Sequence, residues 1–133
     1  MKKLTLLLLL LMISTNVMSE WTIVGSNDVG DGIYYIDYET IKKKGNKVKL
    51  WSLVDTTTVK HIPKGSDFLS STSHFEYDCE EQTRRFLDVC FYSKNMQGGK
   101  IVFSAANIKT DTAESIIPNS MDDVVFKIAC GKK

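Results

Sequence analysis

The fold is decided by one stretch of this chain, which reads Ser73-His-Phe-Glu-Tyr-Asp-Cys79, then Glu80-Glu-Gln-Thr83, then Arg84-Arg-Phe-Leu-Asp-Val-Cys-Phe-Tyr-Ser93. Two runs rich in aromatic and β-branched residues flank a short polar break, and this pattern predicts a β-hairpin. Successive side chains of a strand point to opposite faces, so the first run presents an apolar face and an acidic face. The apolar face carries Phe75, Tyr77 and Cys79. The acidic face carries His74, Glu76 and Asp78.

The second run of this hairpin opens with two arginines, Arg84 and Arg85. Both enter the strand close to Asp78 and Glu76, so the sequence predicts an ion pair across the two strands. An exposed ion pair contributes less than about 1 kcal/mol to stability. Arginine is also a common anchor of protein interfaces, and the hairpin is therefore a candidate recognition surface.

The first 19 residues are typical of a signal peptide. Lys2 and Lys3 precede a nearly unbroken apolar run from Leu4 to Ile13, and Val17-Met-Ser19 fits a cleavage site. The run is about 10 residues long, whereas a membrane-spanning helix needs about 20. We therefore expect an exported protein of the periplasm or cell surface, with one domain at residues 20–133 and no stable membrane anchor after cleavage.

The charge balance excludes one class of partner. Removal of residues 1–19 takes Lys2 and Lys3 from the 17 basic residues and leaves 15 against 16 acidic ones. A chain without excess positive charge lacks the electrostatic attraction to phosphate backbones, so we expect no nucleic-acid binding.

Three cysteines in an exported chain predict one disulfide and one free thiol. The pairings open to them are Cys79–Cys90, Cys79–Cys130 and Cys90–Cys130. With a turn at residues 80–83, Cys90 lies opposite about Ser73 and far from Cys79. The sequence therefore favours Cys79–Cys130, which closes a loop of about 50 residues and stabilises the fold by about 4 kcal/mol in the chain-entropy model.

Further strands are predicted on both sides of the hairpin, at residues 21–24, 33–37, 47–56 and 100–104. Residues 38–41 predict a single helical turn capped by Asp37, and residues 59–71 predict a mobile connection. The strand at 47–56 carries apolar residues on both faces, so we expect both faces to be covered.

One helix is predicted near the end of the chain, after Pro118-Asn-Ser120. Ser120 and Asp123 resemble a capping box, and Gly131 suits the C-cap. Apolar residues recur at helical spacing between these positions. The sequence thus predicts an α+β domain, a single twisted antiparallel sheet of about six strands with a C-terminal helix packed on one face and tethered by a disulfide.

A basic cluster precedes the turn at Gly45-Asn46. It is either a solvated turn that discourages edge pairing or a contact patch for an anionic partner. We include it in the candidate binding surface, which comprises Lys42, Lys43, Lys44, His74, Glu76, Asp78, Arg84 and Arg85.

No catalytic constellation is present in the sequence. His61 and His74 lie neither in an H-E-x-x-H motif nor beside cysteines with metal-ligand spacing. Glu76 and Asp78 lie one strand repeat apart, but the neighbouring arginines indicate a salt-bridge cluster rather than an acid–base pair. We therefore expect no enzymatic activity, no metal and no cofactor.

Several short motifs after residue 19 belong together: Trp21, residues 37–41 with Gly45-Asn46, Val48-Lys-Leu-Trp51, Glu76-Tyr-Asp-Cys79, Arg85, Tyr92-Ser93, Gly98-Gly99, Pro118–Ser120 and Cys130. Together they resemble the surface-adhesin E family. The resemblance implies a six-stranded antiparallel sheet with a C-terminal helix held on its concave side by a disulfide. It also implies adhesion, since the adhesin of this family is an outer-membrane lipoprotein that binds host matrix and serum proteins such as vitronectin and laminin.

The chain departs from that family in two respects. Its signal peptide has no lipid-accepting cysteine, and Cys90 is additional. We expect a non-enzymatic, adhesin-like protein of the bacterial cell envelope that binds host or envelope proteins through the sheet face and loops. The alternative is a periplasmic module with a small-ligand or protein site between sheet and helix. The sequence is compatible with a homodimer as well as with a monomer.

Overall fold

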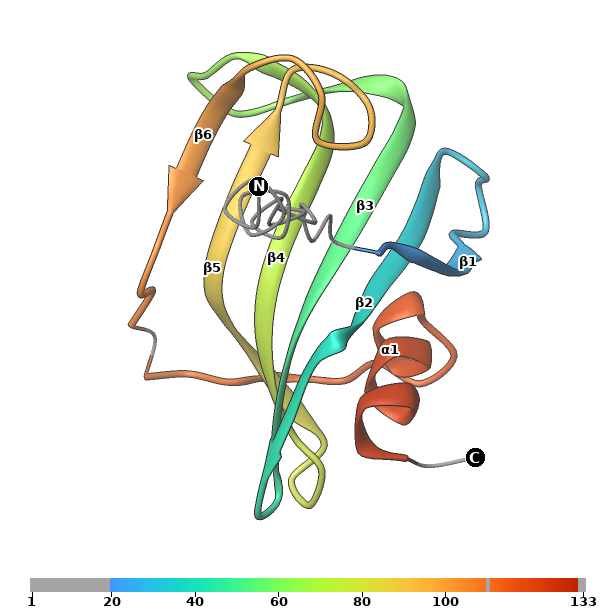
Figure 1. The fold of residues 1–133 in the computed structure, drawn as a ribbon, viewed down its shortest axis with the longest axis vertical. Coiled ribbons are helices and arrows are strands. Elements are labelled where there is room, and N and C mark those ends of the chain that lie inside the picture. Colours follow the sequence, from blue (N-terminus) through green and yellow to red (C-terminus); the bar gives the residue numbers. More distant parts are fainter. Residues whose placement is uncertain (1–19, 110, 132–133) are drawn as a thin grey trace, which may run out of the picture.

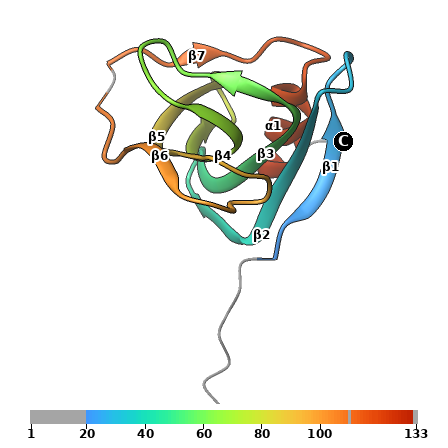
Figure 2. The ribbon, with the colours of Figure 1, turned by 90° about the horizontal axis from the view of Figure 1, so that it is seen from above.

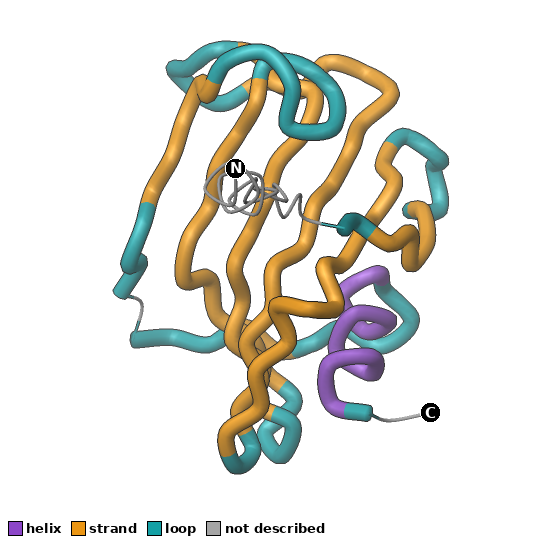
Figure 3. The backbone as a smooth tube through the Cα atoms, in the orientation of Figure 1, coloured by secondary structure: helices purple, strands orange, loops and turns teal. Residues whose placement is uncertain are grey.

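The computed structural model describes residues 20–109 and 111–131. The expected signal peptide, residues 1–19, lies outside the described residues. The strands are β1 (Thr22–Ser26), β2 (Gly32–Lys44), β3 (Lys47–His61), β4 (Asp67–Asp78), β5 (Thr83–Tyr92), β6 (Ile101–Ala105) and β7 (Glu114–Ser115), and the helix is α1 (Met121–Cys130). Figure 1 shows the strands side by side with the helix low against them, and Figure 3 distinguishes the strands and the helix from the loops that connect them.

The strands form one antiparallel sheet in the order β1-β2-β3-β4-β5-β6, and the short β7 pairs with the start of β5. Consecutive strands are neighbours throughout this path, as short hairpin connections require. The helix and the segment that carries β7 lie on one side of the sheet (Figure 2). The predicted α+β class is confirmed, including the helix on one face.

The predicted helical turn at residues 38–41 is wrong, because β2 continues through it to Lys44. The β2–β3 register shifts between Asp37 and Lys42. Within this irregularity the Asp37 carboxylate accepts the Glu39 N–H at 3.1 Å, and the Thr40 hydroxyl donates to the Asp37 carbonyl at 2.6 Å. Asp37 does accept a backbone N–H as a cap would, but the bond closes a bulge in a strand.

The predicted mobile connection at residues 59–71 is also largely wrong. Strand β3 runs to His61 and β4 starts at Asp67, so only residues 62–66 connect them. The loop was expected because the stretch contains Pro63, Gly65 and several serines. Pairing of Lys60 with Phe68 and of His61 with Asp67 keeps it in the sheet.

The main core lies between α1 and the lower half of the sheet. Val48, Leu50 and Ile36 are completely buried there, and the Tyr77 ring lies 6.1 Å from the Phe126 ring of the helix. Burying large apolar side chains is the chief stabilising contribution, at about 1.5–3 kcal/mol for each. The apolar face predicted for the hairpin is therefore the face that receives the helix.

Both helix ends carry the predicted caps. The Asp123 N–H donates to the Ser120 hydroxyl at 3.2 Å, and Gly131 ends the helix with a φ of 67°. The Asp123 carboxylate in turn accepts the Asn119 N–H at 3.0 Å and the Lys127 ammonium at 2.9 Å. A left-handed residue after the last turn is typical of a helix stop, and glycine adopts it without strain.

The predicted Cys79–Cys130 disulfide is confirmed, with its Cα atoms 5.7 Å apart. It joins the end of β4 to the last residue of α1 across 51 positions of sequence. Cys90 is the free cysteine of the described residues. It pairs with Thr72 rather than Ser73, because the turn pairs Asp78 with Thr83, and the β-bulge between His74 and Phe75 reverses only part of that shift.

The second apolar face of β3 is covered by a loop rather than by the helix. Leu53 points away from α1 and is completely buried. Residues 93–100 fold over this part of the sheet, where the Asn95 amide donates to Asp55 at 3.0 Å and the Gln97 N–H donates to the Ser70 hydroxyl at 3.0 Å. The expectation that both faces are covered is correct, with a different cover on each.

We predict that Cys79→Ser lowers the free energy of unfolding by about 2–5 kcal/mol, because it releases a long loop in the unfolded chain. The matched control is Cys90→Ser, which breaks no disulfide and should cost far less. Urea unfolding of both variants under non-reducing conditions measures the difference. Equal losses in the two variants would contradict a stabilising role for this bond.

Candidate binding surface

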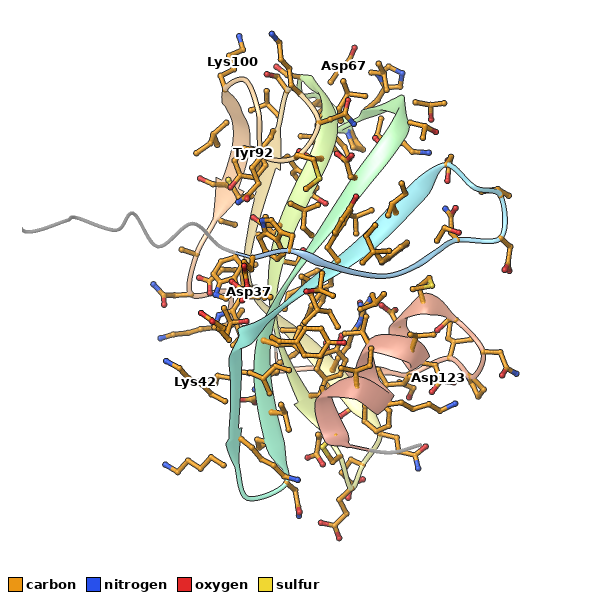
Figure 4. The ribbon with its side chains drawn as sticks, turned by 45° about the vertical axis from the view of Figure 1, so that its right-hand side comes forward. Asp37, Lys42, Asp67, Tyr92, Lys100 and Asp123 are labelled. Atoms are coloured by element: carbon orange, nitrogen blue, oxygen red, sulfur yellow. A yellow bond between two sulfur atoms is a disulfide. The ribbon has the colours of Figure 1, made fainter. Side chains whose placement is uncertain are left out.

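The face of the sheet opposite α1 carries the charged and aromatic side chains that the sequence singled out. We call this the open face, and it comprises Lys42, Lys49, Trp51, His74, Glu76, Arg85 and Asp88. Cross-strand partners point to the same side of a sheet, so the register arranges these residues in rows. Figure 4 shows Asp37, Lys42 and Tyr92 on this side and Asp123 of the helix on the other.

The central row holds a stacked aromatic pair. The His74 imidazole lies parallel to the Trp51 indole, with ring centroids 4.8 Å apart and an interplanar angle of 1°. Nδ1 of His74 is 2.9 Å from Oδ2 of Asp88, and Oδ1 of Asp88 accepts the Asn107 N–H at 3.0 Å. These contacts hold two rings in one orientation, so the open face has a rigid centre.

Sequence reasoning identified His74 but missed Asp88 as its partner. The two are directly opposite only because the bulge in the β4–β5 ladder shifts the register there. A bulge is one extra residue and leaves no clear mark in the alternation of side chains.

The next row consists of charges. The Glu76 carboxylate lies 3.1 Å from Nε of Arg85 and 4.0 Å from Nζ of Lys49. Lys42 completes the row opposite Lys49, and Lys44 faces Lys47 one row lower. The predicted pair between the hairpin strands is thus confirmed for Glu76 and Arg85.

Positive charge is concentrated on the β2–β3 hairpin. Five lysines and Glu76 line a hollow of about 410 Å³ at this end of the sheet. The lysines are Lys42, Lys43, Lys44, Lys47 and Lys49. Like charges that face one another across strands are destabilising, so this clustering costs stability on its own.

Asp78 stabilises the hairpin turn. Its carboxylate accepts the N–H groups of Glu80 and Glu81, each at 3.0 Å, and lies 3.0 Å from the Lys47 ammonium. The pKa of Asp78 is lowered, chiefly by the Glu81 N–H. Its oxygens are therefore committed to the turn rather than free for a partner.

Arg84 lies on the side of the sheet that α1 covers, and so does Lys43, which pairs with the buried Val48; the other candidates lie on the opposite side. Its guanidinium is 2.5 Å from Asp122 of α1 and 3.3 Å from Glu114, and it covers the Phe75 ring at 4.6 Å. Adjacent strand residues point to opposite faces, so Arg84 and Arg85 cannot share a surface. Arg84 ties the hairpin to the helix start, where burial raises the pKa of Asp122 against the opposing effect of Arg84.

Two further hollows flank the sheet. On the open face, a hollow of about 340 Å³ is lined by Trp21, Asp37, Thr40, Trp51, Thr72, Cys90, Tyr92 and Gln97. On the helix side, a groove of about 300 Å³ runs beside α1 and contains Phe75, Phe86, Phe91, Arg84 and Asp122 among its lining residues. Sequence reasoning gave a site between sheet and helix as its alternative but named none of its lining residues, and it did not predict the hollow on the open face, because each hollow is assembled from strands far apart in the chain.

The described residues contain no group of three or more histidine, cysteine, aspartate or glutamate side chains placed to hold a metal ion. Within the same residues, no helix has the length and apolar character needed to cross a membrane.

These features define a small α+β domain, tied by a disulfide, whose sheet has one face under a helix and the other face covered only in part, by residues 93–100. The chain belongs to the surface-adhesin protein E family, whose model matches residues 21–131. A search of the curated proteins finds no match.

The fold is similar to solved structures of protein E from Haemophilus influenzae. One crystal form has a TM-score of 0.59 at 18% identity and aligns over 88% of this chain and 91% of the other. Protein E from non-typeable Haemophilus influenzae has a TM-score of 0.56 at 20% identity, over 88% and 79%. At these identities the likeness shows the fold.

We predict that the hydrogen bonds to Asp88, from the Asn107 N–H and from His74, make stability depend on acid pH. The Asn107 N–H, and then His74, hold the pKa of Asp88 below its ordinary value of 3.8. A lowered carboxyl pKa contributes stability that is present above the ordinary value and is lost as pH falls through the folded-state pKa. Asp88→Asn should therefore unfold more easily at pH 7 and lose less stability on acidification.

Urea unfolding from pH 7 to pH 3 measures this dependence. Asp122→Asn is the comparison of opposite sign, because burial raises the pKa of Asp122. That variant should lose more stability than the unaltered protein on acidification. Identical pH profiles for all three proteins would contradict the assignment.

Proposed function

We propose that this protein is an exported, non-enzymatic binding protein of the bacterial cell envelope that contacts a host or envelope protein through its open face and adjoining loops. Membership of the surface-adhesin protein E family supports a role in adhesion. The observation that carries the proposal is the open face itself, where charged and aromatic side chains are held in order without a covering element.

The physical character of the open face suits protein recognition. Tryptophan and arginine are enriched at the energetic centres of interfaces, and Trp51 and Arg85 lie in adjacent rows. The His74 stack keeps the Trp51 ring in place before any partner arrives. Such preorganisation lowers the entropy lost on binding.

The lysine cluster provides attraction for an acidic partner. Among the described residues, Lys42, Lys43 and Lys44 form no ion pair within 4.0 Å, whereas Lys47 pairs with Asp78. Unpaired surface charge accelerates association with an oppositely charged surface, and salt screens this effect. The lysines of this cluster repel one another, and this repulsion lowers stability. A role in binding therefore explains the cluster better than a role in stability.

Export follows, in this proposal, from the signal peptide expected at residues 1–19, with residues 20–133 as the mature domain. The periplasm and the cell surface are the two destinations that such a leader allows. Adhesion requires the surface.

We predict that the domain is exposed on the cell. Protease added to intact producing cells should digest it, while a known periplasmic protein in the same cells stays intact. Protection of the domain until the outer membrane is opened would exclude adhesion as its principal role. Its partners would then be periplasmic.

We also predict that Lys42→Gln, Lys43→Gln and Lys44→Gln combined weaken binding to cells or matrix and flatten the salt dependence of that binding. The matched control replaces Lys64, Lys94 and Lys100 by glutamine, which removes the same charge at the opposite end of the sheet. Binding of both variants between about 50 and 300 mM salt measures the effect, since the Debye length shrinks over this range. Equal losses in the two variants would assign the effect to net charge alone.

A second candidate function rests on the groove beside α1. Its wall combines aromatic rings with the Arg84–Asp122 ion pair, and such a mixture of apolar surface with a few polar groups is typical of small-ligand sites. A periplasmic ligand-binding module would use this groove. Replacing Phe86 by alanine, which shortens one wall, should then abolish ligand binding and leave the open face intact.

A further inference from the structure

The hollow on the open face contains one strongly buried charge. Asp37 is only 6% exposed, yet it lines the hollow, together with Trp21, Gln97 and residues of β2, β3, β4 and β5. Figure 4 shows Asp37 on the side of the sheet away from α1. Burying a carboxylate is costly unless a cation or several hydrogen bonds compensate for the lost water.

The compensation present within the protein is incomplete. Oδ1 of Asp37 accepts the Glu39 N–H at 3.1 Å. In the described part of the chain no cationic side chain pairs with Asp37, and no fully buried side-chain oxygen lacks a hydrogen bond. The second carboxylate oxygen is therefore accessible from the hollow and can accept a hydrogen bond from a ligand.

The other polar groups of the hollow bind one another. The Trp21 indole N–H donates to Gln97 at 2.8 Å, the Gln97 amide lies 3.4 Å from the Tyr92 hydroxyl, and that hydroxyl lies 3.4 Å from Thr72. The Thr40 hydroxyl accepts the backbone N–H of Trp51 at 3.0 Å. Asp37 is thus the one group here with both a full charge and an open acceptor.

Aromatic rings form the walls around this carboxylate. Trp21, Trp51 and Tyr92 all line the hollow. One face of Trp51 is occupied by the His74 ring, which leaves the indole fixed in orientation. Aromatic faces attract cations through their quadrupoles, and the attraction grows where water is displaced.

From this combination we infer that the hollow binds an organic cation, an alkylammonium or guanidinium group, with the charge at Asp37 and the alkyl chain against the tryptophan rings. The volume of about 340 Å³ accommodates one such group. The group is supplied either by a free amine or by a lysine or arginine side chain of a protein partner. The inference deepens the proposed function, since the hollow adjoins the candidate surface, but it is tested without any protein partner.

The test uses the purified protein and three probes. n-Butylammonium represents a free amine, a doubly capped Gly-Lys-Gly peptide represents a partner side chain, and n-butanol is the uncharged control. The chain has two tryptophans, Trp21 and Trp51, and both line the hollow, so their fluorescence reports occupancy directly. We expect a saturable change with the amine, the peptide or both, and none with butanol.

Two variants separate the contribution of the Asp37 charge to cation binding from that of the shape of the hollow. Asp37→Asn keeps the side-chain volume and removes the charge, so cation binding should weaken by about tenfold or more, the usual worth of a hydrogen bond to a charged group. Asp67→Asn is the matched control, because Asp67 is exposed at the far end of the sheet. Binding that is unchanged in Asp37→Asn would overturn the assignment.

A second readout keeps the test decisive if Asp37→Asn folds poorly. Cys90 is the free cysteine among the described residues and lines the same hollow. The bound cation should slow the reaction of its thiol with a maleimide in the unaltered protein, and butanol should not.

Binding of the peptide alone assigns the site to a partner side chain, and binding of butylammonium alone assigns it to a free amine. Absence of both fluorescence change and thiol protection with every cation would overturn the inference, while leaving adhesion through the open face to its own test on cells.

Discussion

Packing of α1 against the lower half of the sheet gives the two faces of this protein their different characters. Tyr77 and Phe126 form the centre of that contact, and the Cys79–Cys130 bond closes its end. A ten-residue helix is too short to be stable alone in water, so it depends on this apolar contact. Once the helix occupies one face, whatever projects from the other face is left for solvent or a partner.

The open face is ordered by contacts within the sheet. His74 is held by Trp51 and Asp88, and Glu76 is held between Lys49 and Arg85. Each pair is partly exposed and adds little to stability on its own. Their combined effect is to fix the direction of side chains on the part of the sheet that neither α1 nor residues 93–100 cover, which is a property of recognition surfaces rather than of cores.

Irregularities in the strands bring side chains to positions where regular alternation would not put them. The irregularity in β2 between Asp37 and Lys42 brings Lys42, rather than Glu39, opposite Lys49, and the bulge between β4 and β5 sets Asp88 opposite His74. Bulges re-aim side chains at the cost of ladder hydrogen bonds, and they recur beside functional sites. Both of these irregularities serve the open face, and the other consecutive strand pairs carry register shifts as well.

The sequence by itself determined the elements whose causes are local or periodic. Alternation placed Phe75 and Tyr77 on one face and Glu76 on the other, the Ser120 and Gly131 caps bounded the helix, and the spacing of the cysteines favoured Cys79–Cys130. Only the tertiary structure decided how far the strands extend and which residues meet across them. It placed Arg84 on the helix side and kept residues 38–41 and 59–61 in strands. It also brought Asp37 into one hollow with Trp21, Trp51 and Tyr92. The physical reason is that pairing register depends on bulges and on long-range burial, which act between positions tens of residues apart and leave no periodic mark along the chain.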